Sequence, residues 1–196
     1  MPAPDSTTTR PAPATPADRV RQIAVAAGTA IALVGAFLGS GAAGGTPVQD
    51  AADGAFAADA TLLAPAGPAF AIWSVIYLGL VGYAVYQALP RQASRTLHRS
   101  AGWWILLSTL FNGAWILVVQ AGLVGLSLAV IAVLLVVLVV VAAVLRRHPS
   151  EGWADTVLVH GTMGLYLGWV TIATVANVTA LLVRAGFSGL GLSPDA

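Results

Sequence analysis

Five long apolar segments follow one another along this chain of 196 residues. A helix needs about 20 apolar residues to cross the hydrocarbon core of a bilayer, and each segment is long enough. The predicted spans are residues 22–40, 69–89, 101–120, 123–145 and 153–184. The pattern therefore predicts an all-α fold, an integral membrane bundle of five transmembrane helices.

The two ends of the chain lack this pattern. Residues 1–18 hold five prolines among small polar residues, so we expect a disordered N-terminal tail. Residues 19–184 then form one five-helix transmembrane domain, and residues 185–196 a glycine-rich C-terminal tail. Arginines followed by an apolar run and small residues also resemble a signal peptide, but the run 22–40 is longer than the hydrophobic region typical of one. We therefore expect the first helix to be retained.

The predicted connections between helices differ greatly in length. The longest, residues 41–67, contains three aspartates and no arginine. Some of its residues are apolar, so part of it is expected to lie over the end of the bundle: Phe56, Leu62 and Leu63. At the other extreme, little more than Ala121 and Gly122 joins the third and fourth helices, which predicts an antiparallel hairpin.

The composition agrees with a membrane protein. Apolar residues make up 58% and charged residues 9%, against roughly 45–50% and 25% in soluble domains. A net charge of +1 gives no field that would attract nucleic acid, and the absence of cysteine excludes disulfides. All nine basic residues are arginines, and alanine and glycine are abundant, which indicates a GC-rich bacterial genome. We expect a multi-pass protein of a bacterial cell membrane.

The arginines indicate the orientation of the predicted bundle. In a five-helix threading, eight of the nine fall on one side of the membrane and only Arg184 on the other. Loops on the cytoplasmic side carry the excess of basic residues. The N-terminus is therefore predicted in the cytoplasm, and the C-terminus outside together with residues 41–67.

Three of the predicted helices carry aromatic and polar residues on one face. Residues three and four apart lie on the same side of a helix. The residues are Phe70, Trp73 and Tyr77 in the second helix, Trp104, Ser108, Asn112 and Trp115 in the third, and Tyr166, Trp169, Ala173 and Asn177 in the fifth. A polar side chain within the membrane needs a partner inside the protein, so these faces predict a bundle interior or a pocket.

Structural roles explain several of these residues equally well. Tryptophan gathers at membrane interfaces, which favours an interfacial belt for the residues near helix ends, Trp103, Trp104 and Trp153. The amides of Asn112 and Asn177 suit either interhelical hydrogen bonds, worth roughly 0.6–2 kcal/mol each, or a pocket, and the residues leave both open. Gly164 and Gly168 form a GxxxG pattern, typical of close helix packing within a monomer or between monomers.

The sequence contains no recognisable catalytic motif. His160 is the only histidine within a predicted helix, and an ionisable residue there is a functional candidate. No second histidine or cysteine lies near it in sequence, which favours a hydrogen-bonded histidine over a haem or metal ligand. A carboxylate pair, HExxH, a glycine-rich phosphate loop and a nucleophile motif are all absent. We predict no catalytic residue and no metal site, and favour a binding protein over an enzyme.

Three of these patterns, in the same order along the chain, resemble the TspO/translocator family, the tryptophan-rich sensory proteins also called peripheral-type benzodiazepine receptors. The family's fifth helix reads approximately W-V-x-F-A-T-x-x-N, and residues 169–177 read WVTIATVAN. Its third helix carries L-N-x-x-W, here FNGAW at residues 111–115. Its second helix places a phenylalanine, a tryptophan and a tyrosine much as Phe70, Trp73 and Tyr77 are placed in this chain. The chain is similar to a divergent bacterial member.

The resemblance implies a five-helix bundle, often dimeric, whose pocket opens toward the first loop and binds porphyrins, or in some members sterols or synthetic aromatic compounds. By position, the pocket would be lined by Phe70, Trp73, Tyr77, Asn112, Trp115, Tyr166, Trp169, Ala173 and Asn177. No cofactor is required, and porphyrin or haem is the candidate ligand. The cholesterol-type pattern near Arg184 is absent, as is the tryptophan that the family usually has before the second helix, so sterol binding is the least supported property.

Three hypotheses for the function follow. The first is a sensor or carrier that binds a planar tetrapyrrole by stacking on tryptophans, with the bilayer and, in a homodimer, a second copy of the chain as its other partners and no nucleic acid. The second is an enzyme that degrades porphyrin in a light- or oxygen-dependent reaction, as reported for the family. The third is a membrane scaffold without a pocket. The asparagines and tryptophans within the helices favour the first over the third and hardly separate it from the second.

The orientation leads to a first testable prediction. Reporter fusions at Ser94 and Ser150 should be cytoplasmic and one at Asp53 external, because arginine-rich loops stay inside. Reporter activity in intact cells is the measurement. A cytoplasmic signal at Asp53 would overturn the threading.

Overall fold

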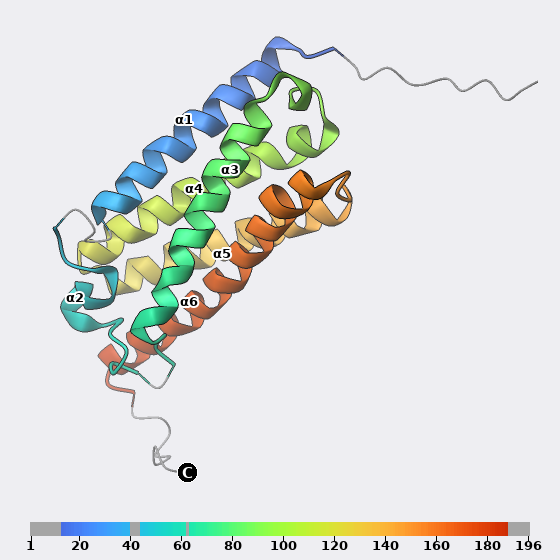
Figure 1. Ribbon diagram of the computed structural model, residues 1–196. Helices are drawn as coiled ribbons and strands as arrows, with labels where there is room; N and C mark the ends of the chain where they lie inside the picture. The colour runs from blue at the N-terminus through green and yellow to red at the C-terminus, as the bar shows by residue number, and fades with distance from the viewer. Residues whose placement is uncertain (1–12, 40–43, 62, 188–196) are drawn as a thin grey trace, which may run out of the picture.

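Five long helices make up most of the computed structural model, which describes residues 13–39, 44–61 and 63–187 (Figure 1). They are α1 (Pro16–Gly39), α3 (Ile72–Ala88), α4 (Thr96–Gln120), α5 (Val124–Arg146) and α6 (Thr162–Arg184). With the short turns that precede α3 and α6, all five are long and apolar enough to cross a membrane. The all-α fold and the five-helix membrane bundle are confirmed. Most of both predicted tails lies outside the described residues.

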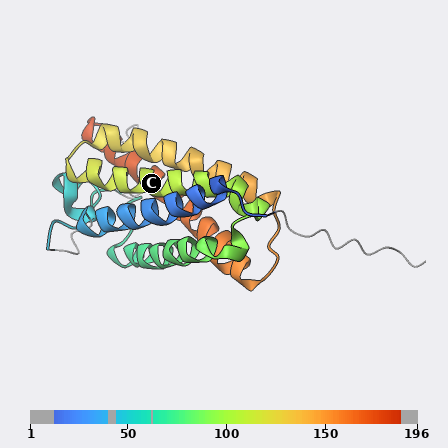
Figure 2. The ribbon, with the colours of Figure 1, turned by 90° about the horizontal axis from the view of Figure 1, so that it is seen from above.

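The helices form a closed ring. α4 packs against α1 and α5, α5 packs against α6, and α3 completes the ring by contacting both α1 and α6 (Figures 1 and 2). The tight α4–α5 turn contains Gly122 at φ +72°, a left-handed conformation that glycine adopts without strain. α4 and α5 are therefore the antiparallel hairpin that their short connection predicts.

Short helical turns fill the connections. The 3₁₀ turn Val48–Asp50 and helix α2 (Ala51–Gly54) follow α1, and the 3₁₀ turn Gly67–Ala71 runs directly into α3. The connection after α1 covers one end of the bundle, where Val48, Ala51 and Phe56 are buried. This placement of Phe56 confirms the prediction for the long loop, whereas Leu63 is exposed and Leu62 lies outside the described residues.

Two helices begin earlier than the hydropathy pattern predicts. α1 starts at Pro16 instead of residue 22, because Thr15 and Asp18 cap its first turn. The Asp18 carboxylate accepts hydrogen bonds from the Thr15 backbone N–H and hydroxyl, both at 2.9 Å, and the Asp18 N–H donates to Thr15 Oγ1. α4 starts at Thr96 instead of residue 101, which brings His98 into a helix, where its side chain is buried. His160 is therefore not the only helical histidine.

We call the end of the bundle where α1 begins the arginine end. Its buried polar residues bond to one another across helices. Asp18 accepts hydrogen bonds from Arg21 at 2.9 Å and from Arg99 at 2.8 and 2.5 Å. Arg21 also donates to the backbone oxygen of Ala93 at 2.7 Å. These contacts hold the start of α1 against the turn after α3 and the first turns of α4.

A second carboxylate holds the start of the last span. Asp155 opens the π-helical segment Asp155–Gly161 that leads into α6, and its side chain is buried. It accepts hydrogen bonds from Arg95 at 2.7 and 2.9 Å, from the Tyr86 hydroxyl at 2.8 Å and from the Glu151 backbone N–H at 3.0 Å. The charge of Asp155 is thus paired, and its oxygens connect α3, the α3–α4 turn and the last span.

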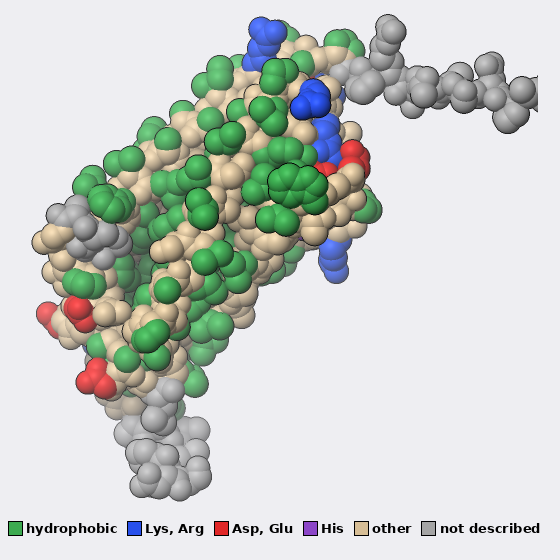
Figure 3. All heavy atoms as spheres, viewed as in Figure 1, with side chains coloured by type: hydrophobic (Ala, Val, Ile, Leu, Met, Phe, Trp, Pro, Cys, Tyr) green, Lys and Arg blue, Asp and Glu red, His purple; other side chains and the backbone are tan. Residues whose placement is uncertain are grey.

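The outer surface of the bundle is apolar between its two ends. Figure 3 shows apolar side chains spread over the visible face, and basic side chains gathered at the arginine end. Trp103, Trp104 and Trp153 are exposed, as an interfacial belt requires. Trp104 therefore lies outside the buried face that Ser108, Asn112 and Trp115 share. The chain is a multi-pass membrane protein, and the side of the membrane that each end faces stays a prediction.

The GxxxG pattern lies on the outside of α6. A Cβ atom built on Gly164 or Gly168 would meet no atom within 4 Å. By contrast, a Cβ atom on Gly79 would come within 2.5 Å of the Thr162 hydroxyl, so that glycine does permit close packing of α3 against the last span. Among the described residues, Gly164 and Gly168 therefore do not serve close packing of α6 against another helix.

The Asp155 contacts lead to a second prediction. Arg95→Met should lower the free energy of unfolding by about 3 kcal/mol, because it leaves a buried carboxylate without its charged partner. Thermal unfolding in detergent measures the loss. Glu151→Gln is the control: its side chain is 77% exposed, so removing its 2.9 Å ion pair with Arg95 should change stability by less than about 1 kcal/mol.

The double variant Arg95→Met, Asp155→Leu distinguishes the charge from the packing. Its stability should exceed that of Arg95→Met alone, because the unpaired carboxylate is gone. Equal instability of both variants would show that the ion pair is not what holds this end together.

Candidate functional site

Three tryptophans from three helices meet in the half of the bundle away from the arginine end. The rings of Trp73 on α3 and Trp115 on α4 are nearly parallel, with centroids 6.2 Å apart and 16° between their planes. Trp169 on α6 meets Trp73 edge to face, also at 6.2 Å. Phe70 packs edge to face on Trp169 at 5.8 Å, and Phe56 on Trp115 at 6.2 Å. The motif positions of the three helices thus form one aromatic cluster.

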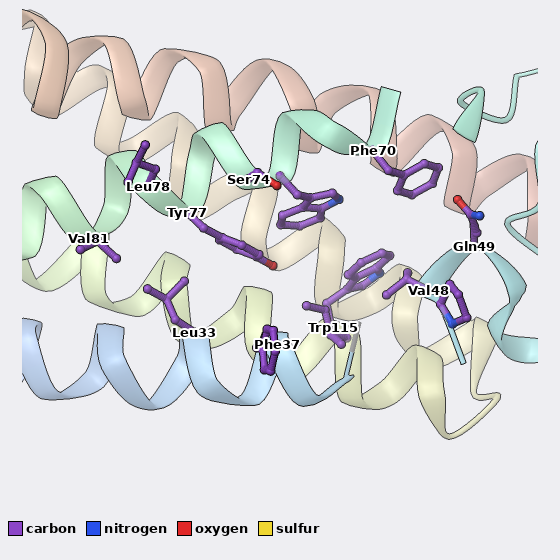
Figure 4. A pocket seen from close by; sticks show the side chains of 13 residues that line it. Leu33, Phe37, Val48, Gln49, Phe70, Ser74, Tyr77, Leu78, Val81 and Trp115 are labelled. Atoms are coloured by element: carbon purple, nitrogen blue, oxygen red, sulfur yellow. The ribbon is translucent and has the colours of Figure 1, made fainter. Parts of the chain in front are cut away.

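A cavity of about 630 Å³ lies beside this cluster, between α1 and α3 (Figure 4). Figure 4 shows Leu33 and Phe37 of α1 facing Tyr77 and Val81 of α3 across it. The complete lining is Leu33, Phe37, Pro47, Val48, Gln49, Phe70, Trp73, Ser74, Tyr77, Leu78, Val81, Trp115 and Ile116. Apart from the Tyr77 phenol, none of these side chains is ionisable, so the cavity offers an apolar, aromatic wall with few polar groups.

The position of the cavity follows from how α1 and α3 are held together. At the arginine end, the side-chain amide of Gln22 donates to the Gln87 backbone oxygen at 2.6 Å, and that of Gln87 donates to the Gln22 backbone oxygen at 3.0 Å. The cavity residues lie in the other halves of both helices. Phe37, Leu78 and Val81 at its mouth are exposed on the lateral surface of the bundle. The cavity therefore opens sideways, toward the region that lipid occupies.

The polar side chains in the wall of the cavity are Gln49, Ser74 and Tyr77, and the Tyr77 hydroxyl is contacted by a neighbouring helix. The Tyr77 oxygen accepts a hydrogen bond from the Asn112 side-chain amide at 3.1 Å, so the Tyr77 O–H is free to donate. The Asn112 Oδ1 atom is buried and has no hydrogen-bond partner among the described residues. Asn112 does not line the cavity, and it acts on the wall by orienting Tyr77.

The aromatic cluster separates this cavity from a much smaller void of about 20 Å³. The small void is lined by Trp169, Ala173 and Asn177, together with Phe70, Trp73 and Trp115, which the two spaces share. A volume of this size holds about one water molecule and no ligand. The nine expected residues thus do not border one continuous cavity.

Asn177 and Tyr166 make contacts between helices. The Asn177 Oδ1 atom accepts hydrogen bonds from Ser127 of α5 at 3.0 Å and from the Trp115 indole at 3.4 Å, while its amide donates to the Ala173 backbone oxygen at 2.9 Å. The Tyr166 hydroxyl donates to the Ser108 backbone oxygen at 3.1 Å, and Tyr166 lines neither space. For Asn177 the geometry favours the interhelical hydrogen bonds that the sequence left open, and Tyr166, expected in the pocket, likewise bonds to a neighbouring helix.

Several wall residues carry no sequence signal for a site. Leu33 and Phe37 lie four residues apart on α1, a helix without the aromatic and polar face seen in the other three. Val48 and Gln49 come from the 3₁₀ turn after α1. The four-residue spacing of Leu33 and Phe37 shows only that these two side chains share a helix face. That this face looks onto α3 depends on how α1 packs, which the residues alone do not state.

The described residues offer no alternative centre for metal chemistry. They contain no group of three or more histidine, cysteine or acidic side chains that could hold a metal ion. His160 lines neither of the two spaces, and its buried Nε2 atom has no hydrogen-bond partner among the described residues. The wall of the large cavity offers stacking, apolar contact and hydrogen bonds from Tyr77, Ser74 and Gln49.

Comparison with known proteins identifies the family. The comparisons with curated proteins and with solved structures found no match. The family described as TSPO-like protein matches residues 24–196, a region that includes all five long helices from the first third of α1 onward. This match covers more than half of the chain and agrees with the resemblance of the tryptophan and asparagine motifs, and it shows that the chain belongs to the TSPO-like family.

Proposed function

We propose that this membrane protein binds a flat aromatic ligand of the porphyrin class, as a sensor or carrier, in the cavity between α1 and α3. The observation that carries the proposal is the apolar cavity of about 630 Å³ walled by the parallel indoles of Trp73 and Trp115. Ligand pockets of this kind usually measure about 300–1,000 Å³ and are lined by apolar and aromatic side chains. A planar macrocycle suits such a wall because it can stack on an indole.

The sideways opening of the cavity supports the proposal that the ligand is apolar and arrives through the membrane. The exposed side chains of Phe37, Leu78 and Val81 would contact lipid when the cavity is empty and the ligand when it is full. The Tyr77 hydroxyl would donate to a polar atom at the edge of the ligand, and Asn112 would hold that hydroxyl in place. The family's sterol ligands are not carried over, because the chain lacks the cholesterol-type pattern.

The side of the membrane and the oligomeric state belong to the same proposal. Segregation of the arginines to one end supports an N-terminus in the cytoplasm of a bacterial cell. The outward position of Gly164 and Gly168 supports a homodimer through α6. Porphyrin degradation is the alternative function, and a binding experiment in the dark and in light distinguishes it, since only an enzyme consumes its ligand.

The cavity leads to a third prediction. Leu33→Trp should weaken protoporphyrin binding at least tenfold, because the larger ring fills the space between α1 and α3, and Trp73→Leu should do the same by removing the stacking surface. Fluorescence titration of purified protein in the dark measures binding. Val136→Leu is the control: it lies exposed on α5, away from both spaces, and should leave the affinity unchanged.

The same titration under illumination tests the alternative. Ligand that stays bound and chemically intact supports a sensor or carrier, whereas ligand loss that requires Trp73 or Trp115 supports an enzyme. Wild-type affinity in Leu33→Trp and in Trp73→Leu, with both variants folded, would refute binding in this cavity.

The two asparagines give a fourth prediction, in which their roles differ. Asn177→Leu should lower the free energy of unfolding by about 2 kcal/mol, because the Trp115 indole loses its acceptor and Ser127 keeps only the Val124 backbone oxygen, and should leave porphyrin affinity nearly unchanged. Asn112→Leu should cost less stability, because its Oδ1 atom is already unpaired, and should weaken binding by releasing the Tyr77 hydroxyl. Thermal unfolding and titration of both variants make the comparison. If Asn177→Leu weakened porphyrin binding and Asn112→Leu did not, Asn112 could not be the residue that orients Tyr77 for binding.

A further inference from the structure

A second cavity, of about 550 Å³, lies at the arginine end, far along the bundle from the aromatic cluster. The turn after α3, the first turn of α4 and the connection from α5 to the last span enclose it. Its charged and titratable lining residues are Arg91, Arg95, Arg99, Arg147, His148 and Glu151. Four guanidinium groups against one carboxylate give this cavity a positive wall, in contrast to the uncharged cavity between α1 and α3.

The four arginines fall into two pairs with different tasks. Arg95 and Arg99 are held by the buried carboxylates of Asp155 and Asp18, and the hydrogen bonds from Arg95 to Asp155 raise the pKa of Arg95 above its ordinary value. Arg91 and Arg147 make no side-chain hydrogen bond or ion pair with any residue that the structure describes. The first pair keeps the cavity in shape, and the second pair brings positive charge that no described carboxylate neutralises.

The backbone adds hydrogen-bond donors of the same sign. Thr96 and Leu97, in the first turn of the 25-residue helix α4, also line the cavity, and no side chain caps that turn. The first N–H groups of a helix have no acceptor within the helix, and they carry the positive end of its dipole. Such a turn beside arginines favours a bound oxyanion.

The exposed carboxylate in the wall marks where an anion would sit. Glu151 is 77% exposed, yet it reaches Arg95 with a distance of 2.9 Å between Oε2 and Nη2. Its removal would leave a guanidinium edge facing the cavity. A ligand with a phosphate group can replace this carboxylate at Arg95 and contact Arg91 and Arg147 as well, so Glu151 competes with the ligand.

The level of the cavity in the membrane indicates the source of the phosphate. Trp103 and Trp104 are exposed on α4 within about two turns of Thr96, and Trp153 is exposed just before the last span. Exposed tryptophans mark the height of lipid headgroups. Basic pockets between transmembrane helices are suited to anionic headgroups, and a free phosphate ion offers the same chemistry. We propose that this cavity binds a phosphate group, supplied by an anionic phospholipid.

The test compares lipid and free ion on purified protein in non-ionic detergent. Native mass spectrometry counts bound phosphatidylglycerol and phosphatidylcholine, and calorimetric titration measures inorganic phosphate. Arg91→Gln and Arg147→Gln should each weaken phosphatidylglycerol binding about tenfold, the effect of losing one charge-assisted hydrogen bond. Arg146→Gln removes the same charge from the neighbouring position, which does not line the cavity, and should have little effect. Glu151→Gln should tighten binding about threefold.

Each outcome decides the proposal. Retention of phosphatidylglycerol over phosphatidylcholine, reduced by the two cavity variants and increased by Glu151→Gln, supports the lipid headgroup. Binding of inorganic phosphate with the same pattern, without preference for phosphatidylglycerol, keeps the phosphate site and overturns the lipid as its source. Equal weakening by Arg146→Gln and Arg147→Gln, or no difference between the two lipids together with no phosphate binding, overturns the proposal. None of these outcomes depends on porphyrin.

Discussion

Two buried carboxylates at the arginine end join four of the five long helices. Asp18 joins the start of α1 to α4, and Asp155 joins the last span to α3 and the α3–α4 turn; in both cases the partner is an arginine from residues 95–99. The reciprocal amide contacts of Gln22 and Gln87 complete this end. Because α1 and α3 are held together here, they can stand apart at the other end, where the cavity of about 630 Å³ lies between them. The uncharged cavity thus depends on polar contacts at the opposite end of the bundle.

The aromatic cluster has two different sides. Toward α1, Trp73 and Trp115 border the large cavity; toward α6, Trp73 meets Trp169, and the void that all three rings line is only about 20 Å³. Trp169 keeps a buried indole N–H without a partner among the described residues. An unpaired buried donor costs about 1–3 kcal/mol, so a ligand or rearrangement that gives it an acceptor would be stabilised by a similar amount.

The sequence predicts the helices well and the site only in part. Long apolar runs reveal spans because a helix pairs all its backbone groups within one segment, as the bilayer core requires, and spacing by three and four residues places Trp73, Trp115 and Trp169 on inward faces. The early start of α1 has a local signal, the Thr15 and Asp18 capping pair, which hydropathy does not measure. The wall formed by Leu33 and Phe37, and the partners of Asn177, depend on which helices become neighbours. Packing between apolar helices decides which of them become neighbours, and the sequence of one helix alone does not reveal this.

The sideways mouth between α1 and α3 changes what a measured affinity means for this protein. A ligand that reaches the cavity from within the bilayer first distributes between water and lipid, so the concentration next to Phe37 and Leu78 is the concentration in the membrane. Occupancy is then set by the product of a partition coefficient and an intrinsic affinity. Under the proposed function, two macrocycles with identical contacts to Trp73 would fill the cavity at different total concentrations if one were more lipophilic, and selection among ligands would begin in the lipid before any side chain is touched.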